Sequence, residues 1–252
     1  AGTIKSIESV RGEEIELYAR GVYKHMSADV AIQGIAQDWV TLTLAIPLLI
    51  VAMFHPNQKK SILLGAGTSF YFLVTYLFYT AMAMYNALFL IYVILLGLSF
   101  FSFAIYWKQL TNKLTSDMYD SKVPRLFSAW FLMINAILIA LLWLSVVVPP
   151  LLEGSIYPDG LQHYTTFIVQ GFDLGLLLPL GFLAGFFWKK GNALGWQMGP
   201  AYLVFLSILM TALTAKIIAM GMSGVNIIPS VFIIPAINLI AVMLSWRCFQ
   251  AL

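Results

Sequence analysis

The sequence predicts an all-α integral membrane protein, a bundle of seven transmembrane helices with an amphipathic N-terminal segment. The 252 residues are 61% hydrophobic and only 10% charged, with a mean hydropathy of +0.88. Soluble domains average about 45–50% apolar and about 25% charged residues. Seven stretches are apolar over the roughly 20 residues that a helix needs to cross a hydrocarbon core. The short alternating segments typical of a transmembrane β-barrel do not occur.

The expected helices cover residues 37–54, 61–83, 86–107, 125–148, 164–188, 197–221 and 227–247. Residues 37–252 therefore form the transmembrane domain, and residues 1–36 form an extracytoplasmic segment. Within it, residues 12–36 are expected to form an amphipathic helix on the membrane surface, and a flexible tail is the alternative. Its apolar side would consist of Ile15, Leu17, Tyr18, Val22 and Tyr23. An additional helix upstream of Ala1 would ease the export of this charged segment.

The connections between the helices alternate in charge. Basic residues follow the first, third, fifth and seventh helices: Lys59, Lys60, Lys108, Lys113, Lys122, Arg125, Lys189, Lys190 and Arg247. The other three connections contain no Lys or Arg. By the positive-inside rule, the basic connections and the C-terminus are cytoplasmic and the N-terminus is outside. We expect the membrane to be a bacterial plasma (inner) membrane.

Two charged residues, Asp173 and Lys216, lie well inside the expected spans and not at their ends. At 1.5 Å per residue, Asp173 lies about 15 Å below the outer end of its helix, and Lys216 about 8–10 Å. They are on consecutive antiparallel helices, so an ion pair between them is geometrically allowed. A charge at the bilayer centre costs about 2.5–3.5 kcal/mol, which pairing would reduce. The alternative for Lys216 is that its ammonium reaches the interface while its stem stays in lipid. Aspartate is too short for that.

Further polar side chains are expected at the same level. Gln170 precedes Asp173 by three residues and so shares its helix face. Tyr71, Thr75 and Tyr79 recur every four residues on the second helix, and Asp38 opens the first. For Asp38 the alternative is a stabilising position near the positive end of its helix. The expected ligand- or ion-binding residues are Asp173, Lys216, Gln170, Tyr71, Thr75, Tyr79 and Asp38, lining an outward-facing pocket for a small ionic or amphipathic ligand.

Two other functions stay open. A membrane enzyme acting on a lipid or quinone at the outer leaflet would use His163, Asp159 and Glu153. A structural subunit would bind its partner through glycines of the fifth helix at four-residue spacing, namely Gly171, Gly175, Gly181 and Gly185.

The sequence favours a protein that is not an enzyme, with no metal and no cofactor. Its three histidines are scattered, and its single cysteine, Cys248, excludes a disulfide framework or a cysteine-cluster metal site. A net charge of +3, carried in short loops, gives no nucleic-acid footprint. The lipid bilayer is the one partner that composition requires, and the identity of the ligand is not encoded in any motif.

Overall fold

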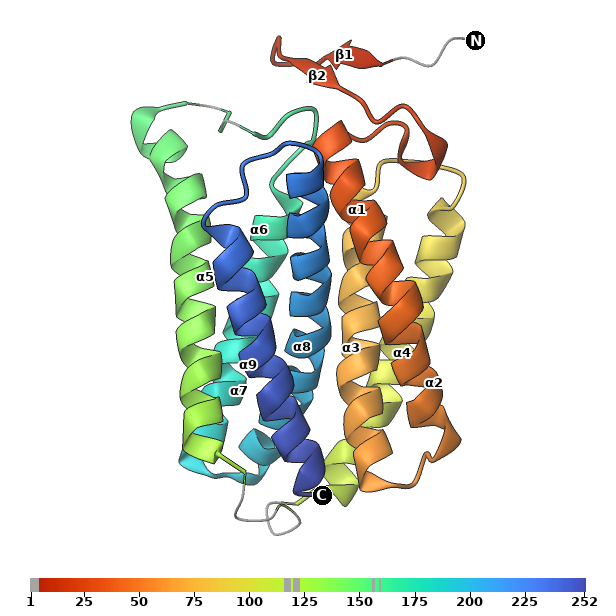
Figure 1. The fold of residues 1–252 in the computed structure, drawn as a ribbon, viewed down its shortest axis with the longest axis vertical. Helices are drawn as coiled ribbons and strands as arrows, with labels where there is room; N and C mark the ends of the chain where they lie inside the picture. Colours follow the sequence, from red (N-terminus) through yellow and green to blue (C-terminus); the bar gives the residue numbers. More distant parts are fainter. Residues whose placement is uncertain (1–4, 116–118, 120–122, 156, 159) are drawn as a thin grey trace.

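The computed structural model describes residues 5–115, 119, 123–155, 157–158 and 160–252. It confirms the seven-helix class, since 76% of the chain is helical and seven helical spans are long and apolar enough to cross a membrane. The spans are Ala28–Phe54, Lys59–Met82, Phe89–Lys113, Arg125–Glu153, Ile168–Lys190, Ala193–Met222 and Ser230–Gln250. They lie side by side in one bundle, with the N-terminus at one end and the C-terminus at the other (Figure 1). The chain is a multi-pass integral membrane protein.

Two of the spans are interrupted by a π-helical turn. The first consists of α1 (Ala28–Val40), the π-turn η2 (Thr41–Ala45) and α2 (Ile46–Phe54). The fifth consists of α6 (Ile168–Phe172), the π-turn η4 (Asp173–Leu177) and α7 (Leu178–Lys190). The other spans are α3 (Lys59–Met82), α4 (Phe89–Lys113), α5 (Arg125–Glu153), α8 (Ala193–Met222) and α9 (Ser230–Gln250).

The N-terminal segment is amphipathic but is not the expected helix. Strand β1 (Ser6–Glu8) pairs antiparallel with β2 (Glu14–Glu16), a 3₁₀ turn, η1 (Gly21–Tyr23), follows, and helix begins only at Ala28. The prediction of helix from residue 12 is therefore wrong for residues 12–27. The physical reason is the period of the pattern, because Ile15 is buried between two exposed glutamates, which is the two-residue alternation of a strand.

Helix α8 is the centre of the bundle. It packs against α1, α3, α7 and α9, and its Leu203, Phe205 and Ala212 are fully buried. Helices α4, α5 and α9 lie further out and expose large apolar side chains such as Phe101, Leu138 and Phe232. Contiguous apolar surface of this kind is typical of contact with a membrane.

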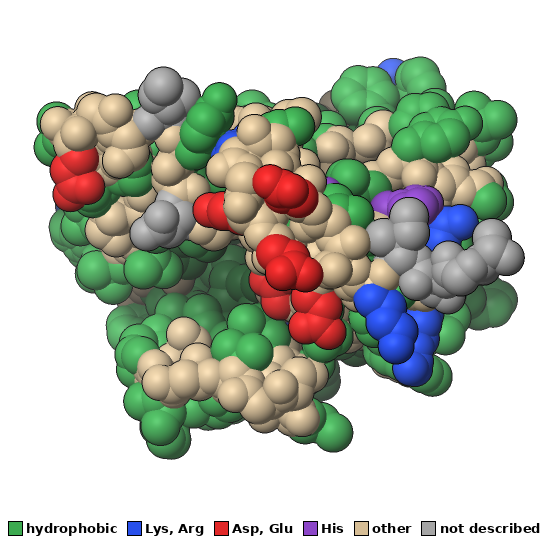
Figure 2. Space-filling view, turned by 90° about the horizontal axis from the view of Figure 1, so that it is seen from above, with side chains coloured by type: hydrophobic (Ala, Val, Ile, Leu, Met, Phe, Trp, Pro, Cys, Tyr) green, Lys and Arg blue, Asp and Glu red, His purple; other side chains and the backbone are tan. Residues whose placement is uncertain are grey.

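The two ends of the bundle differ in charge, since acidic and basic residues are nearly balanced in the N-terminal segment, whereas the connections at the other end are basic. The acidic residues of the β1–β2 hairpin gather at the end that carries the N-terminus, which Figure 2 views from above. The described basic residues of the helix connections lie at the opposite end, with the C-terminus. There Arg125 at the start of α5 donates to the carbonyl oxygens of Trp188 and Lys189, which fastens α5 to the end of α7. We call these the N-terminal and C-terminal ends of the bundle.

Candidate functional site: a charged cavity between α1, α3, α6 and α8

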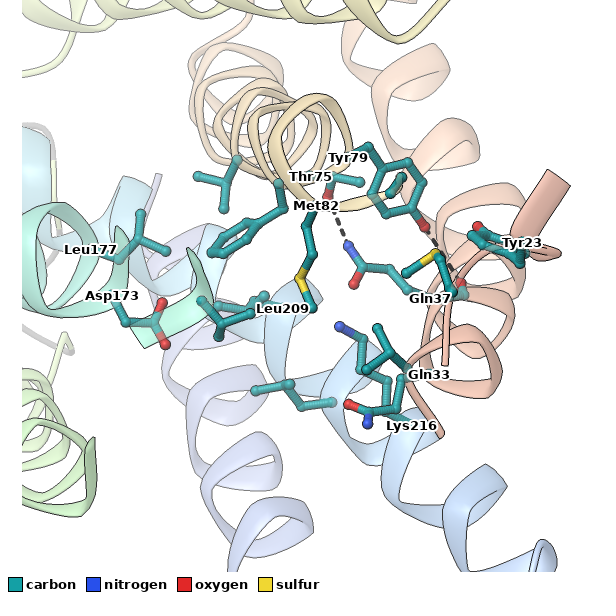
Figure 3. Close-up of a pocket in the computed structure, with 18 residues that line it drawn as sticks. Tyr23, Gln33, Gln37, Thr75, Tyr79, Met82, Asp173, Leu177, Leu209 and Lys216 are labelled. Atoms are coloured by element: carbon teal, nitrogen blue, oxygen red, sulfur yellow. Dashed lines mark hydrogen bonds between the residues drawn. The ribbon is translucent and has the colours of Figure 1, made fainter. Parts of the chain in front are cut away.

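A cavity of about 140 Å³ lies between α1, α3, α6 and α8, in the half of the bundle nearer the N-terminal end (Figure 3). Most of its lining is apolar, including Val30, Phe78, Leu209 and Leu213. Its polar lining residues are Tyr23, Gln33, Gln37, Thr75, Tyr79, Asp173 and Lys216. A mainly apolar cavity with a few convergent polar groups is the usual form of a small-molecule site.

The π-turn η4 places Asp173 in this cavity. The turn ends just before Pro179, and the backbone N–H of Leu178 bonds to the carbonyl of Asp173 instead of the usual fourth-residue carbonyl. Tyr202 on α8 donates to the carbonyl oxygen of Leu177 at 2.8 Å, so this backbone is satisfied within the protein. Turns of this kind inside α-helices occur frequently at functional sites.

Asp173 and Lys216 face the same cavity from different helices (Figure 3). The hydrogen bond that Asp173 receives comes from Trp143 on α5, whose Nε1 lies 2.8 Å from Oδ2. Lys216 makes no hydrogen bond, and no ion pair within 4.0 Å, to any residue that the structure describes. The direct Asp173–Lys216 pair that the sequence allowed is thus not formed. Lys216 turns inward to the cavity, so its ammonium is not at the interface.

The opposite wall is a hydrogen-bonded network of neutral groups around Asp38. Tyr79 donates to Oδ1 of Asp38 at 2.6 Å, and Tyr23 donates to Oδ2 at 2.5 Å. Nearby, Gln37 donates to the hydroxyl of Thr75 at 3.2 Å. Burial, together with the hydrogen bond and negative charge of Asp38, raises the pKa of the Tyr23 phenol far above its usual value. Asp38 is therefore held by two phenols beside the cavity and does not line it.

Two other expected residues lie outside the cavity. Tyr71 is fully buried, and its hydroxyl is 2.9 Å from that of Thr41, so it supports the first π-turn. Gln170 lines a second cavity of about 210 Å³ that lies nearer the N-terminal end. The two cavities adjoin, because both are lined by Val30, Gln33, Met82 and Val169. The second cavity is therefore the neighbour of the cavity with Asp173 and Lys216, on the side of the N-terminal end.

The loop before α6 is fastened to the N-terminal segment. Nε2 of His163 donates to the carbonyl oxygen of His25 at 2.9 Å. The guanidinium of Arg11 donates to the carbonyl oxygens of Gln162 and Tyr164, at 2.6 and 3.0 Å. The structure thus gives His163 a contact that orders the loop. Of its two expected partners, Glu153 is exposed at the end of α5, and Asp159 lies outside the described residues.

The glycines of the fifth span fall into two groups. Gly181 packs against the ring of Tyr202, and Gly185 packs against α5, so both serve contacts within the bundle. At Gly171 and Gly175, an added Cβ would meet no atom within 4 Å. Only this second pair presents an open face.

Sequence reasoning missed three of the groups that build the site. Gln33 lies one turn before Gln37, a spacing that places both on one helix face and that could have identified Gln33. Tyr23 and Trp143 carry no such signal, because their partners Asp38 and Asp173 are brought to them only by the fold. No group of three or more His, Cys, Asp or Glu among the described residues is placed to hold a metal ion.

No protein-family model, no curated protein and no solved structure matches the chain.

Proposed function

We propose that this membrane protein binds a small ionic or amphipathic ligand in the cavity between α1, α3, α6 and α8, and carries it across the membrane. The observation that supports this is the presence of Asp173 and Lys216 in one mainly apolar cavity, without contact between them. Ionisable residues at membrane depth are costly, and they usually mark ligand or ion pathways. A ligand that supplies the missing countercharges offsets that cost.

The charge distribution supports an orientation with the N-terminus outside. Lys59, Lys60, Lys189 and Lys190 lie at the C-terminal end, which the positive-inside rule assigns to the cytoplasm. The second cavity, lined by Gln170, then forms an outer vestibule above the charged cavity. We propose that this membrane is a bacterial inner membrane.

The same cavity suggests how binding is coupled to movement. A ligand seated there contacts α1 and α3 on one side and α6 and α8 on the other. It therefore stabilises whichever arrangement of these helices matches it best, and its differential affinity shifts the population of states. The π-turns in the first and fifth spans are the natural positions for local adjustment of the helices.

Thermal unfolding of the purified protein in detergent tests the proposal against a panel of small anionic, cationic and zwitterionic amphiphiles. At least one class should stabilise the fold, by about 2.7 kcal/mol at a concentration of 100 times Kd. The variant Leu213→Trp, which fills the cavity, should lose this stabilisation. The control Leu138→Trp, on the exposed face of α5, should keep it. Stabilisation by no class, or stabilisation that persists in Leu213→Trp, contradicts the proposal.

A structural subunit is the second candidate, and the open face at Gly171 and Gly175 favours it. Small residues at this spacing let a partner helix approach closely. In that case the isolated chain should be unstable in detergent, and a sharp, monodisperse and long-lived monomer peak would contradict it. The membrane-enzyme alternative has less support, because His163 is engaged by the His25 carbonyl.

A further inference from the structure

The first and fifth spans share an unusual local structure. Each runs from the N-terminal to the C-terminal end of the bundle and contains a five-residue π-turn, Thr41–Ala45 or Asp173–Leu177. In each, a proline follows as the second residue of the next helix, Pro47 or Pro179. Because π-turns are rare, their recurrence with the same proline indicates that the two spans correspond.

The second and sixth spans correspond in the same way. When α3 and α8 are aligned at their first residues, Lys59 and Ala193, each of the three α8 residues that line the cavity matches an α3 residue that also lines it. The matched pairs are Thr75 with Leu209, Tyr79 with Leu213, and Met82 with Lys216, and all six residues line the cavity.

The same count places equivalent residues in contact. It pairs Gly67 with Ala201, and a Cβ on Gly67 would lie only 2.9 Å from the carbonyl oxygen of Ala201. Equivalent residues that meet in this way lie near a two-fold axis. The wider packing agrees, since α1 packs on α8 while its counterpart α6 packs on α3. The bundle therefore consists of two parallel three-span halves, α1–α4 and α6–α9, joined by α5, with the cavity on the axis between them.

The two halves differ in charge where they meet the ligand cavity. The second half supplies Asp173 and Lys216, whereas the first half has Thr41 and Met82 at the corresponding positions. The hydroxyl of Thr41 is hydrogen-bonded to the hydroxyl of Tyr71, and Oδ2 of Asp173 accepts a hydrogen bond from Trp143. Among the described residues, Oδ1 of Asp173 accepts no hydrogen bond and Nζ of Lys216 donates none.

We propose that the cavity binds an apolar zwitterion, an amino acid with a side chain the size of leucine or phenylalanine. Its ammonium would lie at Asp173 and its carboxylate at Lys216, with the side chain among Phe78, Leu209 and Leu213. This rests on the proposed ligand-binding function and specifies its ligand class.

Charge and size both point to this class. A ligand with a single charge would leave one charge of the cavity unpaired in an apolar environment, whereas a zwitterion pairs both. The cavity of about 140 Å³ compares with the roughly 150 Å³ that accommodates benzene in an apolar core. A side chain of that size fits in the cavity, and the adjoining cavity lined by Gln170 extends the space on the side of the N-terminal end.

The internal correspondence supplies the test variants. Asp173→Thr and Lys216→Met each install the uncharged residue that the first half carries at the same position. Isothermal titration of the full chain in detergent would compare L-phenylalanine with 3-phenylpropanoate, which lacks the ammonium, and 2-phenylethylamine, which lacks the carboxylate. Lys189→Met is the control, since it removes a lysine at the C-terminal end, away from the cavity.

We expect L-phenylalanine to bind wild type at least tenfold more tightly than either analogue. In Lys216→Met, L-phenylalanine should bind no more tightly than 2-phenylethylamine. In Asp173→Thr, it should bind no more tightly than 3-phenylpropanoate. Lys189→Met should leave both affinity differences unchanged. Tighter binding of a single-charge analogue overturns the zwitterion assignment but leaves the ligand cavity in place. An unchanged preference for L-phenylalanine in both Lys216→Met and Asp173→Thr also overturns the zwitterion assignment and leaves the ligand cavity in place. Binding of none of the three also overturns it, and the wider panel with Leu213→Trp then decides whether the cavity binds any ligand.

Discussion

At the scale of single residues, two carboxylates in the membrane-spanning helices meet different surroundings. Asp38 accepts hydrogen bonds from the phenols of Tyr23 and Tyr79, which use both of its oxygens. Asp173 lines the cavity and accepts one hydrogen bond among the described residues, from the indole of Trp143 to Oδ2. Asp38 therefore joins α1 to α3 and to the N-terminal segment, whereas Asp173 lines the cavity.

Trp143→Phe removes the single hydrogen bond to Asp173 and keeps an aromatic ring in place. A hydrogen bond to a charged group contributes about 1.5–3 kcal/mol, so the free energy of unfolding should fall by about that amount. Reversible unfolding in mixed detergent micelles measures it. Trp246→Phe on the exposed face of α9 is the matched control and should have almost no effect. Equal losses in the two variants would show that the contact with Asp173 contributes nothing.

Tyr23→Phe should destabilise the protein in a pH-dependent way. At neutral pH the lost bond to Asp38 costs about 1.5–3 kcal/mol. The folded-state pKa of Tyr23 is raised above its unfolded value of about 10. Its contribution is therefore complete below pH 10 and is lost as pH rises above 10, because only the unfolded chain then releases the proton. The stability difference between wild type and Tyr23→Phe should shrink above pH 10, and a constant difference would contradict this.

At the scale of elements, close approach of helices depends on a few glycines. Gly199 on α8 contacts the fully buried ring of Trp188, and a Cβ added there would collide with that ring. A Cβ added to Gly97 on α4 would meet no atom within 4 Å. Both lie inside α-helices, so the two differ in packing and not in backbone conformation.

Gly199→Ala and Gly97→Ala should therefore have opposite effects on thermal stability. Overpacking a well-filled core costs about 1–3 kcal/mol, so Gly199→Ala should lower the free energy of unfolding by that amount. Gly97→Ala should leave it unchanged or raise it by up to about 1 kcal/mol, the helix preference of alanine over glycine. A stabilising Gly199→Ala would mean that α7 and α8 are less closely packed than described.

At the scale of the whole molecule, the bundle places its charges at two distinct ends and its cavity nearer one of them. The hairpin and the loop before α6 are joined by Arg11 and His163 into a cap at the N-terminal end. The lysines of the connections lie at the opposite end. Which end faces outward therefore decides which side of the membrane is nearer to the cavity.

Cysteine labelling of intact cells with a membrane-impermeant maleimide tests the orientation. Val10→Cys, 95% exposed in the N-terminal segment, should react from outside, whereas Lys113→Cys at the other end of α4 should not. The native Cys248 is buried and should contribute little background. Reaction at Lys113→Cys and protection of Val10→Cys would invert the orientation, and the cavity would then open to the cytoplasm.

The sequence by itself determined the class of this protein, because the length and hydropathy of each span are local properties set by the bilayer. It also located Asp173, Lys216, Thr75 and Tyr79, which all line one cavity. It placed the start of the first helix at 37, not at Ala28, because the polar residues before it lowered the local hydropathy. In the structure that helix instead turns Gln33 into the cavity.

Only the tertiary structure decided which polar groups meet. Trp143, which no local pattern distinguishes, reaches Asp173 because α5 packs against the fifth span. Lys216 and Asp173 face one cavity without touching, and the hydroxyl of Tyr71 is hydrogen-bonded to Thr41 outside that cavity. These outcomes depend on the rotation and packing of helices far apart in the sequence. The correspondence between the two halves likewise emerged from backbone π-turns and facing residues, which leave almost no trace in hydropathy.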